Sequence, residues 1–288
     1  MGASLSDYLG RVTITDGGWG TQLQLAGLAP GACPDELNAS NPAAVEAVAR
    51  SYVQAGSRII LTNTFSSNRV SLAKYGLEAR AADLSERGAA ISRRAAGRDV
   101  KVFGSIGPSG KIVMMGQAAP EELTEAFAAQ AAALERGGCD ALVCESFAEL
   151  EEIVLAIRAA CQATKLPVVA SMTFDSGPDK TSTMMGNAPA EVAAAAASAG
   201  AAAIGANCGV GPEVLVKVTA LLRVATALPI WMKPNAGLPV VQQGKTSFPM
   251  GPAEFTAFAR QFASAGANFL GGCCGTNPEH IKALCQAV

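Results

Sequence analysis

The sequence has little histidine, little charge of either sign and no long apolar run. It contains one His, 22 Lys and Arg, and 24 Asp and Glu among 288 residues. A net charge of −2 without blocks of like charge does not provide the basic surface that nucleic-acid binding requires. No apolar run approaches the roughly 20 residues of a membrane span, and the N-terminal residues lack the pattern of a signal peptide. We therefore expect a cytoplasmic protein that binds neither nucleic acid nor membranes.

The scarcity of histidine also limits the kind of metal site that this chain can form. His280 alone cannot make a histidine-based site, and it leaves little room for histidine acid–base catalysis. The chain has eight cysteines, and without a secretion signal these are free thiols, metal ligands or a nucleophile more often than disulfides. Any metal should therefore be held by sulfur.

The sequence does contain a regular alternation of short β-rich segments and alanine-rich segments with helical periodicity. The predicted strands are 11–16, 58–62, 101–105, 141–145, 167–173, 202–207, 229–233 and 268–272. The predicted helices are 42–55, 121–136, 149–163, 191–199, 212–226, 252–265 and 278–287. Eight parallel strands joined by right-handed helical crossovers close into a barrel. We predict a single (β/α)8 barrel (TIM barrel) over residues 1–288. The alternative is an open doubly wound sheet, but no dinucleotide-type glycine-rich turn follows the first strand.

Three long glycine-rich loops follow predicted strands, at 107–119, 175–187 and 237–251. All three should lie at the carboxyl ends of the strands, where barrels of this type carry their active sites. They are either lids that exclude water or dock a second substrate, or passive connections.

Three cysteines follow the sixth and eighth strands and should share one rim of the barrel. Cys208 ends the sixth strand, and Cys273 and Cys274 end the eighth. Strands lie about 4.8 Å apart, so a gap of about 10 Å separates these two, which cysteine side chains with Zn–S bonds of about 2.3 Å can span. Adjacent cysteines can reach one metal only if the backbone turns sharply, and the flanking glycines permit such a turn.

Three thiolate ligands with one open position are typical of a catalytic rather than a structural zinc site. Three thiolates and Zn²⁺ sum to −1, and a fourth thiolate from the substrate makes −2, so the bound sulfur stays electron-rich while its proton is removed. Such a site suits methyl transfer to a small thiol. The alternative is that buried cysteines act as small hydrophobic residues, which we favour for the other five: Cys33, Cys139, Cys144, Cys161 and Cys285.

These residues resemble the homocysteine S-methyltransferase family, whose thiol-binding barrel is shared by cobalamin-dependent methionine synthase and betaine–homocysteine methyltransferase. The matching motifs are Asp-Gly-Gly-Trp-Gly-Thr-Gln (16–22), Leu-Thr-Asn-Thr-Phe (61–65), Gly-Ser-Ile-Gly-Pro (104–108), Asn-Cys-Gly (207–209), Pro-Asn-Ala-Gly-Leu-Pro (234–239) and Gly-Gly-Cys-Cys-Gly-Thr (271–276). The resemblance implies that Cys208, Cys273 and Cys274 hold zinc and that the thiol substrate is homocysteine.

The resemblance also implies that Asp16 and Glu145 receive the amino group of homocysteine. Both end predicted strands, so both should reach the same rim, where carboxylates form charge-assisted bonds with an ammonium group. Gly17 and Gly18 could offer backbone N–H groups to the carboxylate of the amino acid. The alternative roles are a turn cap for Asp16 and a surface ion pair for Glu145.

Asn235 ends the seventh strand, between the two strands that carry the cysteines. Its amide oxygen could fill the open zinc position until the thiol arrives. Alternatively, Asn235 only hydrogen-bonds its own turn.

The sequence ends soon after the eighth strand, so we expect the methyl donor to arrive separately. The candidates are a methylated corrinoid on a partner protein, a sulfonium compound such as S-methylmethionine or S-adenosylmethionine, and betaine. Betaine ranks last because Ser146 stands where betaine enzymes carry a tyrosine.

Residues 172–178 and 183–186 resemble stand-alone partners of corrinoid proteins. The candidate aromatic residues at the rim are Trp19, Phe65, Phe147 and Phe174. The methionines that would offer a docking surface, or instead pack in the core, are Met114, Met115, Met184 and Met185.

Two further hypotheses remain open from the sequence. The barrel could methylate another thiol or a selenol. It could also be a non-catalytic zinc or redox protein, or a scaffold for a corrinoid protein, although a structural zinc normally has four protein ligands and only three are strong candidates here.

Overall fold

Eight parallel strands form one sheet in the computed structural model, which describes residues 5–242 and 245–288. The strands are β1 (Thr13–Ile14), β2 (Ile59–Leu61), β3 (Lys101–Ile106), β4 (Ala141–Phe147), β5 (Val168–Met172), β6 (Ala203–Asn207), β7 (Ile230–Lys233) and β10 (Phe269–Leu270). Their order is β1-β10-β7-β6-β5-β4-β3-β2, so each strand pairs with the next barrel strand along the chain. All eight predicted strands are present. The first four residues of the predicted domain 1–288 lie outside the described residues.

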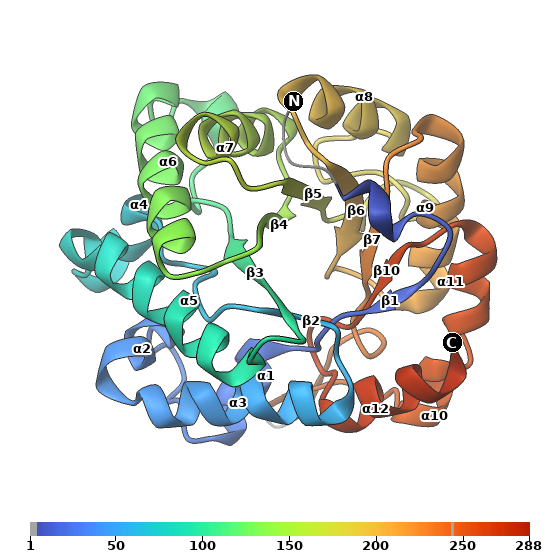
Figure 1. The fold of residues 1–288 in the computed structure, drawn as a ribbon. Helices are drawn as coiled ribbons and strands as arrows, with labels where there is room; N and C mark the ends of the chain where they lie inside the picture. The colour runs from blue at the N-terminus through green and yellow to red at the C-terminus, as the bar shows by residue number, and fades with distance from the viewer. Residues whose placement is uncertain (1–4, 243–244) are drawn as a thin grey trace.

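The two edges of this sheet, β1 and β2, meet and nearly close it into a barrel. The backbone N–H of Arg58 donates to the carbonyl of Ile14 (2.9 Å), and Ser57 Oγ donates to the carbonyl of Thr15 (3.3 Å). In Figure 1 the strands form the central ring and the helices surround it. The predicted (β/α)8 barrel is thus confirmed.

Within residues 5–242 and 245–288, seven longer helices and five short ones surround the strands. The longer helices are α3 (Pro42–Ala55), α5 (Ala81–Ala96), α6 (Pro120–Arg136), α7 (Leu150–Ala163), α8 (Pro189–Ala199), α9 (Pro212–Ala225) and α12 (Pro278–Ala287). The short helices are α1 (Trp19–Leu25), α2 (Leu37–Ser40), α4 (Arg69–Leu72), α10 (Pro252–Thr256) and α11 (Ala259–Ala265). The predicted helix 252–265 is wrong as a single element, because the chain turns between α10 and α11.

Helix α5 was not predicted, and its packing explains why. Gly88 lies in its middle, where a glycine weakens the helical pattern of a sequence. A Cβ atom at Gly88 would lie 2.5 Å from Thr64 Cγ2 and 2.6 Å from Asn38 Nδ2. The glycine is therefore required for close contact between α5 and the segments around Asn38 and Thr64, a contact that local sequence does not reveal.

The interior of the barrel consists of two layers. Nearest the start of the strands lies an apolar layer, which we define by its residues Ile59, Leu61, Phe103, Ala141, Val143, Val169, Ala203, Trp231 and Phe269. The Phe103 and Trp231 rings stack at 5.7 Å, and the Trp231 and Phe269 centroids are 5.3 Å apart. Side chains alternate along a strand, so the next inward positions lie two residues on. These are polar, and we define the polar layer as Ser105, Glu145, Asn207 and Lys233.

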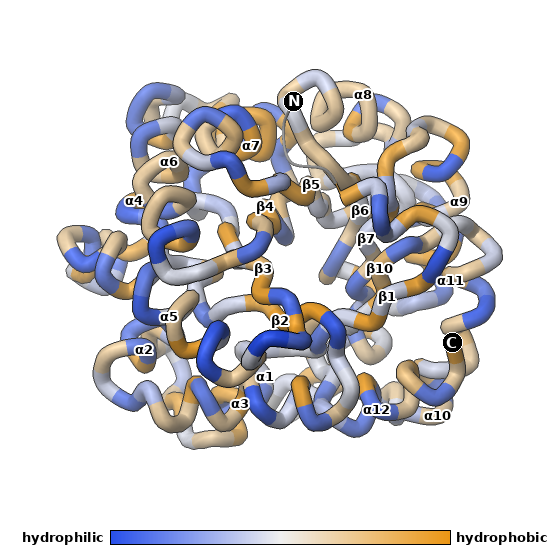
Figure 2. Tube along the Cα trace, viewed as in Figure 1, coloured by the Kyte–Doolittle hydropathy of each residue, from blue (hydrophilic) through white to orange (hydrophobic). Residues whose placement is uncertain are grey.

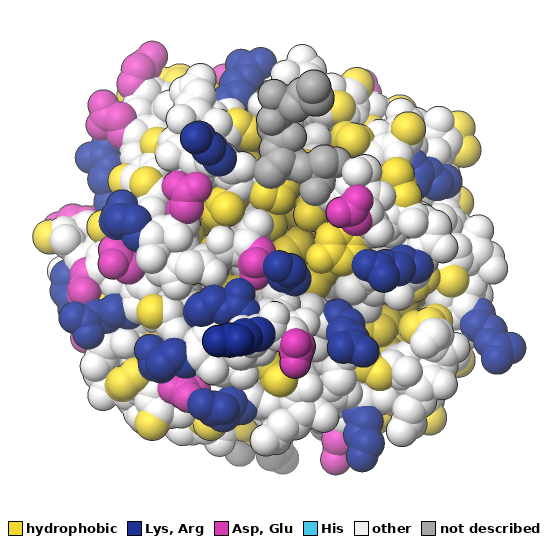
Figure 3. All heavy atoms as spheres, viewed as in Figure 1, with side chains coloured by type: hydrophobic (Ala, Val, Ile, Leu, Met, Phe, Trp, Pro, Cys, Tyr) yellow, Lys and Arg dark blue, Asp and Glu magenta, His cyan; other side chains and the backbone are white. Residues whose placement is uncertain are grey.

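The second core lies between the barrel and its helices. Outward-facing Leu142 and Cys144 of β4 belong to it, together with helix residues such as Val45, Leu134 and Ile157. Figure 2 shows hydrophobic stretches on β3, β4 and β5, and hydrophilic positions that recur along the surrounding helices. On the face seen in Figure 3, Lys and Arg side chains surround a hydrophobic centre. Within the described part of the chain, no helix has the length and apolar composition needed to cross a membrane.

The three predicted rim loops differ in how they are held. In loop 107–119, Glu149 accepts hydrogen bonds from the N–H groups of Val113 (2.9 Å) and Met114 (2.8 Å), and Glu152 accepts one from Ser109 N–H (2.7 Å). Loop 175–187 is closed by an isolated bridge between Ser176 and Ser182. Loop 237–251 contains an unpredicted antiparallel hairpin, β8 (Val240–Gln242) and β9 (Lys245–Ser247), while its residues 243–244 lie outside the described residues. The buried anchors of loop 107–119 favour a fixed connection there.

Candidate metal and thiol site

The structure brings Cys208, Cys273 and Cys274 together at one end of the barrel. Their sulfur atoms all lie within 4.8 Å of one another, and the Cys208 and Cys274 sulfurs are 3.9 Å apart. Four ligands arranged tetrahedrally at about 2.3 Å from zinc place the sulfurs about 3.8 Å apart. Among the described residues this is the only cluster of His, Cys, Asp or Glu that could hold a metal ion.

Cys208 lies in a strained turn directly after β6. Its φ is +62°, in the left-handed region that costs a residue with a side chain of order 1 kcal/mol. The turn is held from both sides, because Cys208 N–H donates to the Lys233 carbonyl (3.2 Å) and the Cys208 carbonyl accepts from Val210 N–H (2.7 Å). Strain that the surroundings maintain in this way is typical of functional sites.

Cys273 and Cys274 lie in the sharp turn that the flanking glycines were expected to permit. Cys273 N–H donates to the Pro234 carbonyl (2.8 Å), and the turn continues through Gly275, whose φ is +81°. Cys274 N–H donates to Asn235 Oδ1 at 3.1 Å. The amide oxygen of Asn235 thus already holds the cysteine turn, which supports a positioning role; its role as an exchangeable zinc ligand stays a prediction.

The three thiols interact strongly. Hydrogen bonds from Cys273 and Cys274 lower the pKa of Cys208, and these hydrogen bonds to Cys208, together with burial and the Cys208 charge, raise the pKa of the other two thiols. By themselves the thiols therefore favour one negative charge at Cys208. A divalent cation allows all three to ionise, because metal binding releases the thiol protons. The donor set fits a thiophilic metal such as zinc.

Gly17 and Gly18 pack directly against the cysteine turn. A Cβ atom at Gly18 would lie 2.5 Å from the Cys273 carbonyl oxygen, and one at Gly17 would lie 2.8 Å from Thr276 Oγ1. The N–H of Gly18 donates to Thr276 Oγ1 (3.0 Å), and Tyr52 Oη donates to the Gly18 carbonyl (3.0 Å). The Gly18 N–H is therefore bonded to Thr276 in this structure and Gly18 permits close packing, while its binding of a substrate carboxylate stays a prediction.

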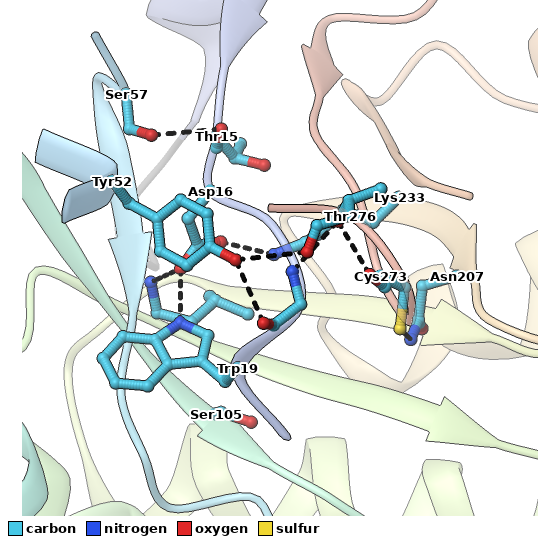
Figure 4. A network of polar contacts seen from close by, with 12 residues as sticks. Thr15, Asp16, Trp19, Tyr52, Ser57, Ser105, Asn207, Lys233, Cys273 and Thr276 are labelled. Carbon is cyan, nitrogen blue, oxygen red and sulfur yellow. Dashed lines mark hydrogen bonds and ion pairs between the residues drawn. The ribbon is translucent and has the colours of Figure 1, made fainter. Parts of the chain in front are cut away.

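Asp16 is fully buried and has three donors. Lys233 Nζ forms an ion pair with its Oδ1, while Trp19 Nε1 (2.6 Å) and the N–H of Leu61 (2.7 Å) donate to its Oδ2. Figure 4 shows Asp16 between Lys233 and Trp19. The site thus contains a lysine that sequence analysis did not single out. Asp16 is not part of the cavity wall and pairs with Lys233 here, and its predicted contact with a substrate ammonium group stays a prediction.

Glu145 occupies the inward position two residues after Val143, where β4 becomes irregular near its end. The register of β4 against β5 shifts between Cys144 and Phe147, and the intervening Ser146 has a φ of +62°. Ser105 Oγ donates to Glu145 Oε1 (2.5 Å). Burial raises the pKa of Glu145, and the nearby charge of Lys233 partly opposes this rise. Glu145 is buried in the barrel interior and is not part of a surface ion pair.

Asn207 connects the irregular end of β4 to the cysteine turn. Its Oδ1 accepts from Ser146 N–H (2.9 Å) and Ser171 Oγ (2.6 Å), and its Nδ2 donates to Ser146 Oγ (2.6 Å). The same Nδ2 lies 3.8 Å from Cys273 Sγ, within range of an N–H···S hydrogen bond. Sequence analysis missed this role, although alternation along β6 from Ala203 through Gly205 points Asn207 inward.

A cavity of about 360 Å³ opens onto the cysteines. Its wall includes all three of them together with Glu145, Lys233, Gly17, Gly18, Trp19 and Phe65. The other two aromatic candidates, Phe147 and Phe174, are fully buried in the outer core and do not contribute to the wall. The cavity wall therefore combines the sulfur ligands, two carboxylates (Glu145 and Asp35), one ammonium group and two aromatic side chains.

The remaining candidates lie elsewhere. Cys33, Cys139 and Cys144 are buried as expected of small hydrophobic residues, whereas Cys161 is exposed and Cys285 partly buried. His280 is a structural residue, since its ring nitrogens lie 2.8 Å from Asn277 Oδ1 and 3.0 Å from the Met250 carbonyl. Core packing of the rim methionines is wrong for the three that are exposed: Met114, Met115 and Met184.

Comparison with known proteins agrees with the fold and the sequence motifs. The sequence model of the family described as homocysteine S-methyltransferase matches residues 13–288. Methionine synthase from Mycobacterium leprae (strain TN) is 34% identical over 297 residues, which cover 96% of this chain and 24% of that protein. Methionine synthase from Mycobacterium tuberculosis (strain ATCC 25618 / H37Rv) is also 34% identical, over 96% of this chain and 25% of that protein. The chain thus spans about a quarter of the length of these relatives.

Solved structures show the same fold. The homocysteine methyltransferase MmuM from Escherichia coli in its oxidized form has a TM-score of 0.81 and 24% identity, covering 96% of each chain. Its metallated form has a TM-score of 0.81 and 23% identity, again covering 96% of each chain.

Proposed function

The chain belongs to the homocysteine S-methyltransferase family, and from this premise we propose that it methylates the sulfur of homocysteine to form methionine, using zinc held by Cys208, Cys273 and Cys274. The observation that carries the zinc assignment is the cluster of three sulfurs within 4.8 Å at the end of an open cavity. A zinc ion on three thiolates supplies an open fourth position and lowers the pKa of a thiol that binds there. This cluster thus supports a substrate that is itself a thiol.

Residues of the chain prepare the site for this chemistry. The Nδ2 group of Asn207 offers a donor to Cys273 Sγ, which stabilises negative charge on that sulfur. Asn235 and the carbonyl of Lys233 fix the backbone of Cys274 and Cys208. Second contacts of this kind orient metal ligands and tune their basicity.

Glu145 is the proposed receptor for the amino group of homocysteine. It faces the cavity, it is nearly buried, and Ser105 occupies only one of its two oxygens. An ammonium group beside a buried carboxylate stabilises the ionised form and forms a strong charge-assisted bond. The methyl group then moves from donor to sulfur, as the new S–C bond forms and the bond between the donor and the methyl carbon breaks.

The proposed donor is a methylated corrinoid held by a partner protein, or a sulfonium compound. Exposed apolar side chains at the rim loops, Phe65 in the cavity wall and Met114, Met115 and Met184 beyond it, support the approach of a bulky donor from this side. We also propose a cytoplasmic location, since all eight cysteines are free thiols and a reducing compartment keeps them so.

The test combines metal content with a methyl-transfer assay. Protein purified under reducing conditions is analysed for zinc and then given homocysteine with methylcobalamin, S-methylmethionine, S-adenosylmethionine or betaine in parallel. About one zinc per chain and methionine from one donor support the proposal and identify the donor class. Protein that holds no zinc, or zinc-loaded protein that forms no methionine from any donor, contradicts it.

A further inference from the structure

Lys233 is the one basic residue in the cavity wall among the residues that the structure describes. It ends β7, the strand between the two that carry the cysteines, and its side chain is 2% exposed. A buried ammonium group is costly unless it is paired, so its presence beside a substrate cavity requires an explanation. Part of the explanation is the ion pair with Asp16.

The ion pair fixes the position of the Lys233 ammonium group but does not use its full bonding capacity. Asp16 is itself immobilised by donors from Trp19 and Leu61. The Lys233 Nζ atom also lies 5.8 Å from the centre of the Trp231 ring, which belongs to the apolar layer. An ammonium group has three N–H donors, and Asp16 is its only ion-pair partner in the described part of the chain. Two donors therefore remain for a group in the cavity.

The negative charges around the cavity leave few places for an anion, and Lys233 marks one of them. Glu145 and the proposed zinc site with four thiolates are negative, whereas Lys233 presents an ammonium group whose pair with Asp16 is neutral as a unit. The amino acid carboxylate adds one more negative charge, and it requires a cationic or N–H partner. The N–H of Gly18 is already bonded to Thr276, which leaves Lys233 as the strongest donor facing the cavity.

We propose that Lys233 binds the carboxylate of the thiol substrate, that Asp16 is the positioning residue that holds the Lys233 ammonium group, and that the site therefore selects zwitterionic amino acid thiols. Lys233 and Glu145 would act as a pair of opposite charges that match the carboxylate and the ammonium of one substrate end. This inference rests on the proposed function, and it adds a specificity-determining residue to it.

The experiment compares three thiols of similar length with zinc-loaded wild type and K233M. Homocysteine carries both charges, 4-mercaptobutanoate lacks the ammonium group, and 3-aminopropanethiol lacks the carboxylate. We measure the binding of each thiol by calorimetry, and KM and kcat with the active donor. Loss of a charged hydrogen bond predicts affinity about 10- to 100-fold weaker in K233M for the two carboxylates, and a change of less than about threefold for 3-aminopropanethiol.

Matched variants separate recognition from folding. Because K233M leaves Asp16 buried without its partner, the double variant D16N/K233M removes both charges and should show the same selectivity with better stability. K217M makes the same substitution at an exposed lysine of α9 and should leave all three affinities unchanged. E145Q should show the reverse selectivity and weaken only the two amines. Zinc content is measured for every variant.

The inference is overturned if K233M and D16N/K233M weaken all three thiols equally, or if they bind homocysteine as tightly as wild type does. Failure of the proposed function gives a different pattern, in which wild type binds the thiols with charge selectivity but forms no methylated product. The binding data thus test Lys233 independently of turnover.

Discussion

The two layers of the barrel interior are built on the same strands but have opposite properties. Trp231 belongs to the apolar layer and Lys233, two residues later on β7, belongs to the polar layer; Phe103 and Ser105 have the same relation on β3. In the apolar layer the aromatic rings pack against one another. The end of the barrel with the polar layer contains a buried ion pair and two residues, Ser146 and Cys208, with φ of +62°.

This difference indicates how stability and function are divided within the molecule. Burial of large apolar side chains stabilises the folded state, so the apolar layer contributes most per residue to the free energy of unfolding. Left-handed residues and buried charges oppose stability, and they persist only where the surrounding structure holds them. Substitutions in the apolar layer should therefore change stability, and substitutions at the polar end should change zinc binding and substrate recognition.

Replacement of a proposed zinc ligand should give the largest effect. C208A removes one of three thiolates and keeps a Cβ at φ +62°, so the backbone strain of the turn is unchanged. We expect loss of bound zinc and of detectable methyl transfer with a preserved fold, measured by metal analysis, turnover and circular dichroism. C161A is the matched control, since Cys161 is exposed on α7 and should be dispensable. A C208A protein that retains zinc and activity would show that Cys208 is not a ligand.

A substitution in the apolar layer should give the next largest effect. It should lower stability and leave zinc binding unchanged. F103A removes a ring that stacks on Trp231, so the free energy of unfolding should fall by about 3 to 5 kcal/mol. Denaturant titration measures this change. The variant should keep about one zinc per folded chain and an unaltered KM for homocysteine. Loss of zinc at temperatures where F103A is still folded would contradict the division between the layers.

Asn207 should show an intermediate effect, because it acts on the ligands without being one. N207A removes the donor near Cys273 and the bonds that hold Ser146. Loss of such contacts typically weakens metal affinity or activity by about 10- to 100-fold. Zinc affinity is measured by competition with a chelator. N207D keeps the acceptor for Ser146 N–H but loses the donors, so normal zinc affinity in N207D would rule out the contact with Cys273.

Substitution of Asp35 should give the smallest effect. Asp35 is a buried carboxylate of the cavity wall that lies outside both layers. Burial raises the pKa of Asp35 from 3.8 to about 6. Between pH 3.8 and about pH 6 the Asp35 carboxyl keeps in the folded protein a proton that it has lost in the unfolded chain. The protonated carboxyl therefore contributes to stability at low pH, and this contribution decreases as the pH rises and is lost above about pH 6.

The variant D35N removes this pH dependence. Its amide oxygen can still accept the bonds that Ser66 N–H and Ser67 Oγ now donate. The stability of D35N relative to wild type should therefore rise by about 1 to 2 kcal/mol between pH 4 and pH 7. Denaturant titrations of both proteins at each pH check this, and parallel stability curves would show that the pKa of Asp35 is not raised.

Local sequence was sufficient for the barrel and for the cysteine cluster. Short apolar segments at even spacing predicted all eight strands, because strand and helix periodicity are local properties. Strand ends share one rim of a barrel, so the sequence alone placed Cys208, Cys273 and Cys274 together. These predictions required only the order of the elements and the residues at their ends.

Long-range contacts could not be predicted in the same way. Lys233 and Asp16 are 217 residues apart, and nothing near either residue indicates their pairing. Gly17 and Gly18 suggested free N–H groups, but close packing against Thr276 and Cys273 engages the Gly18 N–H and explains both glycines. Such contacts depend on how the closed barrel brings β1 beside β10. Lys233, the proposed carboxylate receptor, could therefore be identified only from the folded arrangement.

The most direct test of the central claim is X-ray absorption at the zinc edge, measured on the zinc-loaded protein before and after addition of homocysteine. The account predicts three sulfur neighbours at about 2.3 Å in the absence of substrate and four in its presence. A sulfur count that does not change when homocysteine is added, or fewer than three sulfurs at the start, would contradict a site in which Cys208, Cys273 and Cys274 leave one position open for the substrate thiol.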